Sequence, residues 1–90
     1  MQTHEEIIKN LYDDFSEEIE SGTKYLEMAE SADALGDTAL AAGLATMAHE
    51  EYTHGKYILM NLKRAGHRLS DDCWKKWQEF ESKIHQVFHH

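Results

Sequence analysis

The sequence predicts an all-α protein, and three observations point to this class. The chain of 90 residues contains no proline and only five glycines, the two residues that interrupt helices most strongly. Apolar residues recur at steps of three and four along most of the chain, which is the period of an α-helix. A chain of this length forms one domain over residues 1–90 and buries only about 60% of its unfolded surface, which favours association.

The first helix is predicted over about residues 3–35. Thr3 followed by Glu6 matches a capping box at its N-terminus, and Gly36 ends it. Its apolar positions follow the helical period and are Ile8, Leu11, Tyr12, Phe15, Ile19, Leu26 and Ala29.

The second helix is predicted over about residues 38–65, capped by Asp37 or Thr38 and ended by Gly66. Lys63 and Arg64 lie in its last turn, where cations suit the helix dipole. Its apolar positions are Leu40, Leu44, Met47, Ile58, Leu59 and Leu62. Because the joint at Gly36 is so short, the first two helices form an antiparallel hairpin.

A shorter third helix is predicted over about residues 70–88, beginning at Ser70 with Asp71 and Asp72. Trp74 and Trp77 are expected to pack this helix against the hairpin or against a neighbouring chain. Met28, Met47 and Met60 are expected to fill the core, because methionine adapts to irregular gaps.

Charge and composition exclude several classes of partner. With 9 basic and 17 acidic residues the net charge is −8, which argues against binding a nucleic-acid backbone. No apolar run approaches the roughly 20 residues that span a bilayer, and no signal-peptide pattern is seen. The single Cys73 rules out an internal disulfide and favours a reducing compartment, so a cytoplasmic location is expected. The helix dipole is expected to lower the pKa of Cys73, although no nearby base predicts a reactive role.

Three polar residues interrupt the apolar faces of the hairpin. Glu18 lies on the face of the first helix that carries Phe15 and Gly22. Glu51 and His54 lie within the apolar face of the second helix, whereas His49 and Glu50 fall toward its edge or outside it. Counted from Gly36, all three residues lie roughly 22 to 27 Å from the turn, so they share one height along the hairpin.

These three residues predict half of a metal site. Buried carboxylates need a partner because desolvating their charge is costly, and the Glu51-x-x-His54 spacing directs both side chains to one side of the helix. Two such hairpins related by a two-fold axis, with their turns at opposite ends, would bring together four glutamates and two histidines. Carboxylate and imidazole ligands without thiolate suit iron or manganese, with zinc also open.

The run from Glu18 through Tyr25, Ala29, Ala32 and Gly36, followed by Ala48-x-x-Glu51-x-x-His54, resembles one half of a rubrerythrin-type, ferritin-like domain. The resemblance covers about residues 14–59. It implies that Glu18, Glu51 and His54 are iron ligands, with Tyr25 beside them. The missing second hairpin makes the chain similar to encapsulated ferritins, whose centre forms across a dimer interface. The resemblance thus implies a homodimer, or a higher homo-oligomer, that closes into a ferritin-like four-helix bundle.

The resulting hypothesis is a non-haem di-iron ferroxidase that uses oxygen or peroxide to oxidise Fe(II), in iron handling or storage. Each dimer would bind two iron ions. An encapsulin shell is a further partner that the resemblance suggests, although no targeting tail is recognised after Phe88. The Cys-x-x-Cys module of rubrerythrin is also missing.

Two other functions stay open from the sequence. One is a rubrerythrin-like di-iron peroxide scavenger supplied by an external reductant. The other is a metal-free helical interaction module, in which the acidic stripe binds a basic partner. Taken singly, Glu18 would be a boundary glutamate, and Glu51 and His54 a hydrogen-bonded surface pair. His85 and His89 form an i, i+4 pair that could bind a metal ion. With His90 at the end of the sequence, a frayed terminus or a tag remnant explains these histidines better, so all three are left out of the predicted site.

Overall fold

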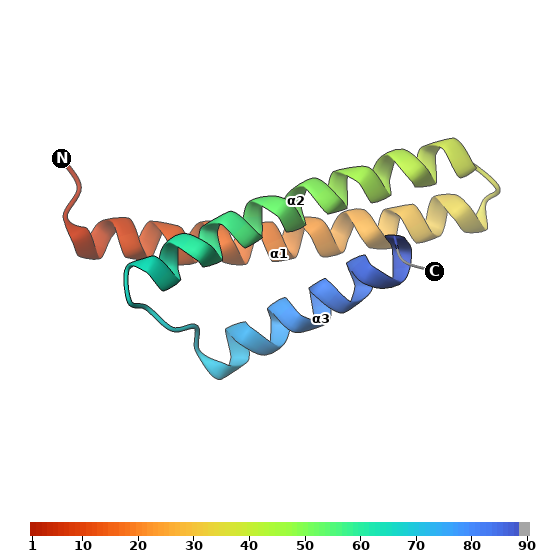
Figure 1. Cartoon of the computed structure of the whole chain (residues 1–90). Coiled ribbons are helices and arrows are strands. Elements are labelled where there is room, and N and C mark those ends of the chain that lie inside the picture. The colour runs from red at the N-terminus through yellow and green to blue at the C-terminus, as the bar shows by residue number, and fades with distance from the viewer. Residues whose placement is uncertain (89–90) are drawn as a thin grey trace.

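A computed structural model, in which residues 1–88 are described, contains three helices (Figure 1). These are α1 (His4–Ala34), α2 (Thr38–Arg64) and α3 (Asp71–Phe88). α1 and α2 lie side by side as an antiparallel hairpin, and the shorter α3 packs along one face of it. The predicted all-α hairpin with a third helix is therefore confirmed. Among the described residues, no helix is long and apolar enough to cross a membrane.

Four of the six predicted helix ends lie one residue outside the observed ones, because they included capping residues that lie outside the helices, and the ends at Thr38 and Phe88 coincide. At the N-terminus of α1, the Thr3 hydroxyl accepts a hydrogen bond from the Glu6 backbone N–H at 3.1 Å. At the start of α2, a carboxylate oxygen of Asp37 accepts one from the Leu40 N–H at 3.0 Å. The Ser70 hydroxyl caps α3 in the same way.

The turn between α1 and α2 consists of Leu35, Gly36 and Asp37. Gly36 adopts a φ of 83°, in the left-handed region that favours glycine. Its N–H donates to the Asp33 carbonyl at 2.9 Å, and the Asp37 N–H donates to the Ala32 carbonyl at 3.0 Å. These bonds use the last free carbonyls of α1 and reverse the chain within three residues.

All three helices contribute to the main hydrophobic core. Its fully buried members include Phe15 from α1, Ala48 from α2, and Trp77 and Phe80 from α3. A second, smaller cluster near the turn is built largely from alanines and consists of Ala29, Ala32, Leu44 and Ala45. The aromatic core therefore lies where α3 covers the hairpin, and the turn end relies on close packing of α1 against α2.

Two glycines allow α3 to approach the hairpin closely. The Phe80 ring occupies the space that a Cβ on Gly22 would take, and a Cβ on Gly55 would lie 2.7 Å from the Trp77 ring. The Trp77 ring also stacks on Tyr52, with centroids 5.2 Å apart and an interplanar angle of 19°. The Tyr52 hydroxyl donates a 2.7 Å hydrogen bond to Glu81 on α3, and this bond together with burial raises the pKa of Tyr52 to about 12.

The two tryptophans differ in their packing. Trp77 is 2% exposed and packs against the hairpin, as predicted. Trp74 is 39% exposed, with the Lys63 ammonium 5.8 Å from its ring centroid.

The prediction that Met28, Met47 and Met60 fill the core is wrong for the single chain, since all three are 40% or more exposed. Leu40, predicted on the apolar face of the second helix, is exposed as well. Successive residues of a helix are about 100° apart around its axis. By this spacing, Met28 of α1 and Met47 of α2 lie on the side of the hairpin away from Gly22 and Gly55, where α3 packs. We call this uncovered side of the hairpin the free face.

Replacing Gly55 by alanine should destabilise the metal-free protein by about 1–3 kcal/mol, because the new methyl group would overlap the Trp77 ring and force it to move. Gly43→Ala is the matched control. A Cβ at Gly43 meets no atom within 4 Å, so alanine should stabilise α2 by about 0.5–1 kcal/mol. Urea unfolding followed by circular dichroism measures both changes. Equal shifts of the same sign would show that α3 does not sit on Gly55 as described.

Candidate metal centre

The three predicted ligands lie at the middle of the hairpin. Glu18 is the fifteenth of the 31 residues of α1. Glu51 is the fourteenth of the 27 residues of α2, and His54 follows one turn later. The antiparallel turn at Gly36 places these midpoints opposite one another, as residue counting from the turn predicted.

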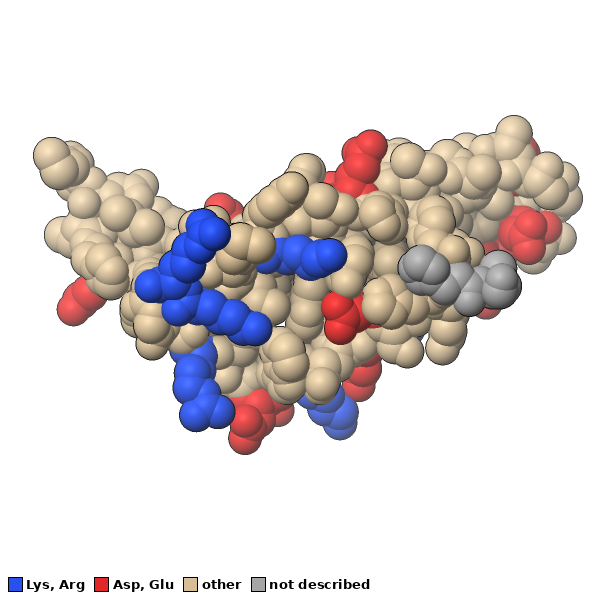
Figure 2. Space-filling model, in the orientation of Figure 1, with Lys and Arg blue, Asp and Glu red and all other residues tan. Residues whose placement is uncertain are grey.

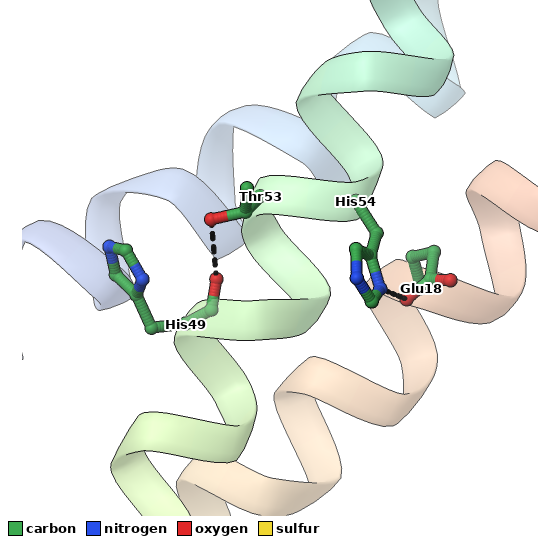
Figure 3. Close-up of polar contacts among 4 residues, drawn as sticks. All are labelled: Glu18, His49, Thr53 and His54. Carbon is green, nitrogen blue, oxygen red and sulfur yellow. Dashed lines mark hydrogen bonds and ion pairs between the residues drawn. The ribbon is translucent and has the colours of Figure 1, made fainter.

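One ligand atom from each of Glu18, Glu51 and His54 lies within 4.8 Å of the other two. Figure 3 shows the His54 ring and the Glu18 carboxylate directed toward each other from α2 and α1, and the Nδ1–Oε2 distance is 3.8 Å. The sequence-predicted residues therefore meet in space and form a group that can hold a metal ion.

Glu18 carries an unsatisfied oxygen at this group. Its Oε2 atom is buried and has no hydrogen-bond partner among the described residues, since the 3.8 Å separation from His54 is too long for a hydrogen bond. Burial, followed by the neighbouring Glu51 carboxyl, raises the pKa of Glu18 from its ordinary value of 4.5 to about 7. The His54 side chain is more exposed than that of Glu18, at 59% against 21%.

His49 shows by contrast which histidine belongs to the group. In Figure 3 the His49 ring lies on the other side of α2 from Glu18. It contacts the rings of Tyr52 and Phe88, with centroids 6.0 and 5.0 Å away. The hydrogen bond drawn from the Thr53 hydroxyl ends on the backbone carbonyl of His49, so it does not orient the imidazole.

The donor set consists of two carboxylates and one imidazole. Hard oxygen donors with a nitrogen donor suit iron and manganese, and zinc accepts the same ligands. Three protein ligands leave further coordination positions open for another carboxylate, water or a reactant. A metal ion here would also give the buried oxygen of Glu18 the partner that it lacks.

Sequence reasoning missed two neighbouring acids. The charges of Asp14 and Glu17 add to the rise in the pKa of Glu18. Asp14 precedes Glu18 by four residues, so the helical spacing offered a signal for its proximity.

The other residues that the sequence singled out lie outside this group. Tyr25 packs against both core clusters. Burial raises the pKa of the Cys73 thiol, so the predicted lowering by the helix dipole is wrong. The His85 ring lies 6.0 Å from the Tyr52 ring, and His89 and His90 fall outside the described residues.

Comparison of the chain with models of known protein families, with curated proteins and with solved structures finds no match. The resemblance to half of a ferritin-like domain therefore stays a prediction from the motif residues.

Because the folded-state pKa of Glu18 is raised, this group favours folding at low pH, and that contribution is lost as the pH rises through about 7. Metal-free Glu18→Gln protein should therefore gain stability relative to the wild type as the pH rises from about 5 to 8. Urea unfolding of both proteins across this range measures the difference.

Glu20→Gln removes a nearby exposed acid that is not among the causes of the raised pKa of Glu18, and its difference from the wild type should stay nearly constant over the same range. A Glu18→Gln difference that is equally flat would show that Glu18 is not desolvated as the structure describes.

Proposed function

We propose that this protein oxidises Fe(II) to Fe(III) at a centre of two metal ions shared between two copies of the chain. The observation that carries the proposal is the meeting of Glu18, Glu51 and His54 around a buried carboxylate oxygen without a partner. The Glu18 side chain is 21% exposed overall, and desolvating one of its oxygens without a hydrogen bond favours a compensating cation.

Two copies are proposed because one copy supplies half of a known ligand set. Ferritin-like di-iron bundles use one glutamate from each of two helices and a Glu-x-x-His pair from each of two others. Here α1 contributes Glu18 and α2 contributes Glu51 with His54. All three lie near the helix midpoints. A two-fold axis perpendicular to the hairpin at this level would therefore bring the two half-sites together while the helices of the two copies overlap along their full length.

The chemistry follows from the ligand set. Two Fe(II) ions each give up one electron, and together these electrons reduce dioxygen to hydrogen peroxide with the uptake of two protons. Anionic oxygen ligands stabilise Fe(III) more than Fe(II), because the electrostatic attraction grows with the charge of the ion. Four carboxylates around two irons therefore favour the oxidised product.

The residues of the chain act by holding the substrate iron and shaping its surroundings. Glu18 and Glu51 supply negative charge from facing helices, and His54 supplies a neutral nitrogen donor. Phe15 and Tyr52 are buried on the α3 side of the hairpin, so that side is closed to solvent.

Anaerobic titration of the metal-stripped protein with Fe(II) should saturate at about one iron per chain, which is two per pair of copies. Admission of oxygen should then produce ferric absorbance. Glu18→Ala and His54→Ala should each abolish paired-iron binding and reduce the rate of oxidation to the rate without protein. The helical circular dichroism should stay nearly unchanged, because none of these side chains belongs to the aromatic core.

Glu20→Ala and His49→Ala are the matched controls, since both are close in sequence to the ligands and neither joins the group. They should bind and oxidise iron as the wild type does. Wild-type oxidation rates in Glu18→Ala or His54→Ala would overturn the site. Catalytic removal of peroxide with an external reductant, without accumulation of Fe(III), would indicate a peroxide scavenger. Absence of saturable binding would indicate a metal-free helical module.

A further inference from the structure

One side of α2 carries an exposed stripe with the spacing of a helix–helix seam. Its members recur at alternating steps of four and three residues, the pattern by which two helices pack along their length. All of them are exposed, and the stripe passes through the candidate ligand His54. They are Gly43, Met47, Glu50, His54, Tyr57, Asn61 and Arg64.

The stripe lies on the free face of the hairpin. It contains two large exposed side chains, Met47 at 40% and Tyr57 at 60% exposure. α3 does not cover them, because it contacts the hairpin at Gly22 and Gly55, on the opposite side of the α1–α2 contact. A regularly spaced surface with two large exposed apolar side chains, beside an incomplete set of ligands, is suited to packing against another helix.

Charge is distributed unevenly along the hairpin. Between Lys24 and Lys56 the sequence has six acidic residues and no lysine or arginine. Figure 2 shows lysine and arginine side chains gathered at the other end, where α2 leads into α3. That end carries Lys63, Arg64 and Arg68. Toward the turn each copy carries four of these acids, and Lys83 of α3 lies beside three of them; the four are Glu27, Glu30, Asp33 and Asp37. Two copies with their turn ends together would gather eight acids, whereas copies in opposite directions place the turn of each near the cations of the other.

We infer that α2 of one copy packs antiparallel against α2 of a second copy along this stripe, so that Glu50 of each copy lies beside His54 of the other. The two-fold axis then passes at the level of position 52. The inference rests on the proposed shared centre for the identity of the partner, because one copy provides only half of the ligands. Beyond the proposed function, the inference names α2 as the helix that forms the seam, gives the antiparallel direction of the two α2 helices, and gives the residues that lie opposite one another.

The register pairs residues of matching chemistry. Met47 of one copy meets Tyr57 of the other, and an S–aromatic contact between them is favourable. Gly43 lies opposite Asn61 and leaves room for its side chain. Arg64 lies within one helical turn of the level of Asp37. Glu50 is thereby a positioning residue, whose carboxylate accepts a hydrogen bond from the imidazole of the neighbouring His54 and fixes the ring for metal binding.

The same face also explains why the pair needs metal. In each copy Glu51, Asp14 and Glu17 lie close enough to Glu18 to act on its charge. With Glu50 on the stripe, ten carboxylates would gather near the proposed axis. Their repulsion opposes association until cations bind. Metal ions should thus shift the equilibrium from single chains to pairs.

Cross-linking tests the seam directly. In a Cys73→Ser background, Met47→Cys and Tyr57→Cys chains are mixed, with and without Fe(II) under anaerobic conditions, and treated with a short bismaleimide. The mixture should give mostly the mixed covalent dimer, and more of it with Fe(II). Either variant alone should give little, because its two cysteines lie ten positions apart on antiparallel helices, about 15 Å. Tyr57→Cys mixed with Gln78→Cys, on the exposed side of α3, measures the background.

Iron stoichiometry on the same samples separates the two proposals. One iron per chain without the mixed cross-link overturns the seam and leaves the proposed function standing. The mixed cross-link without iron binding supports the seam and overturns the function. Self-cross-linking of a single variant at the level of the mixture places the copies in another register and overturns the seam.

Charge reversal gives an independent measurement. Arg64→Glu should weaken the iron-loaded dimer about tenfold by analytical ultracentrifugation, because the changed contact occurs twice in each pair. Lys75→Glu changes the charge equally on exposed α3 and should leave the dimer constant within about twofold. Equal effects of the two variants would show that only net charge matters and would overturn the seam.

Discussion

The turn between α1 and α2 decides which side chains meet across the hairpin. Leu35, Gly36 and Asp37 reverse the chain, and the left-handed Gly36 allows the helices to pair with no further residue between them. One inserted residue at this point would rotate α2 by about 100° relative to α1. Glu51 and His54 would then turn away from Glu18. The candidate centre is therefore set by the geometry of a turn that lies at the far end of the helices.

The two sides of the hairpin differ in composition: one carries the aromatic core that stabilises the fold, and the other carries the candidate metal ligands. On one side Phe15, Trp77 and Phe80 are almost fully buried and supply most of the large apolar contacts. On the other side Glu18 is desolvated without a hydrogen bond to its Oε2 atom. An apolar side chain would be more favourable at that position in the absence of metal. The aromatic core offsets this cost, so the polar group does not have to contribute to the stability of the fold.

Local features of the fold were predictable from the sequence, because they depend on neighbouring residues. The caps at Thr3 and Asp37 and the stop at Gly36 were found where the sequence placed them. The meeting of Glu18 with His54 was also predictable, since a short turn and a constant rise per residue fix the heights of both.

The face covered by α3 was not predictable in this way. Met28, Met47 and Leu40 follow the same apolar period as the core residues, and periodicity does not tell a covered face from an uncovered one. The answer depends on Gly22 and Gly55, where Phe80 and Trp77 fit only because no Cβ is present. These contacts join residues that are far apart in the sequence. The partial burial that raises the pKa of Cys73 has the same long-range origin.

The connection of α3 to the hairpin also bears on how copies associate. Because α3 is tied to α2 by a short connector, its effective concentration at the Gly22–Gly55 face far exceeds the concentration of any second copy. In the proposed pair, a second copy would therefore compete poorly for that face and would bind on the other side, where Glu18, Glu51 and His54 lie. When each copy uses the same single face, two copies related by a two-fold axis bury both faces and no further copy can add. A hairpin with two uncovered apolar faces could bind a copy on each side and form larger assemblies. In the proposed arrangement α3 thus limits association to a pair and directs it to the face where the second half of the ligands is required.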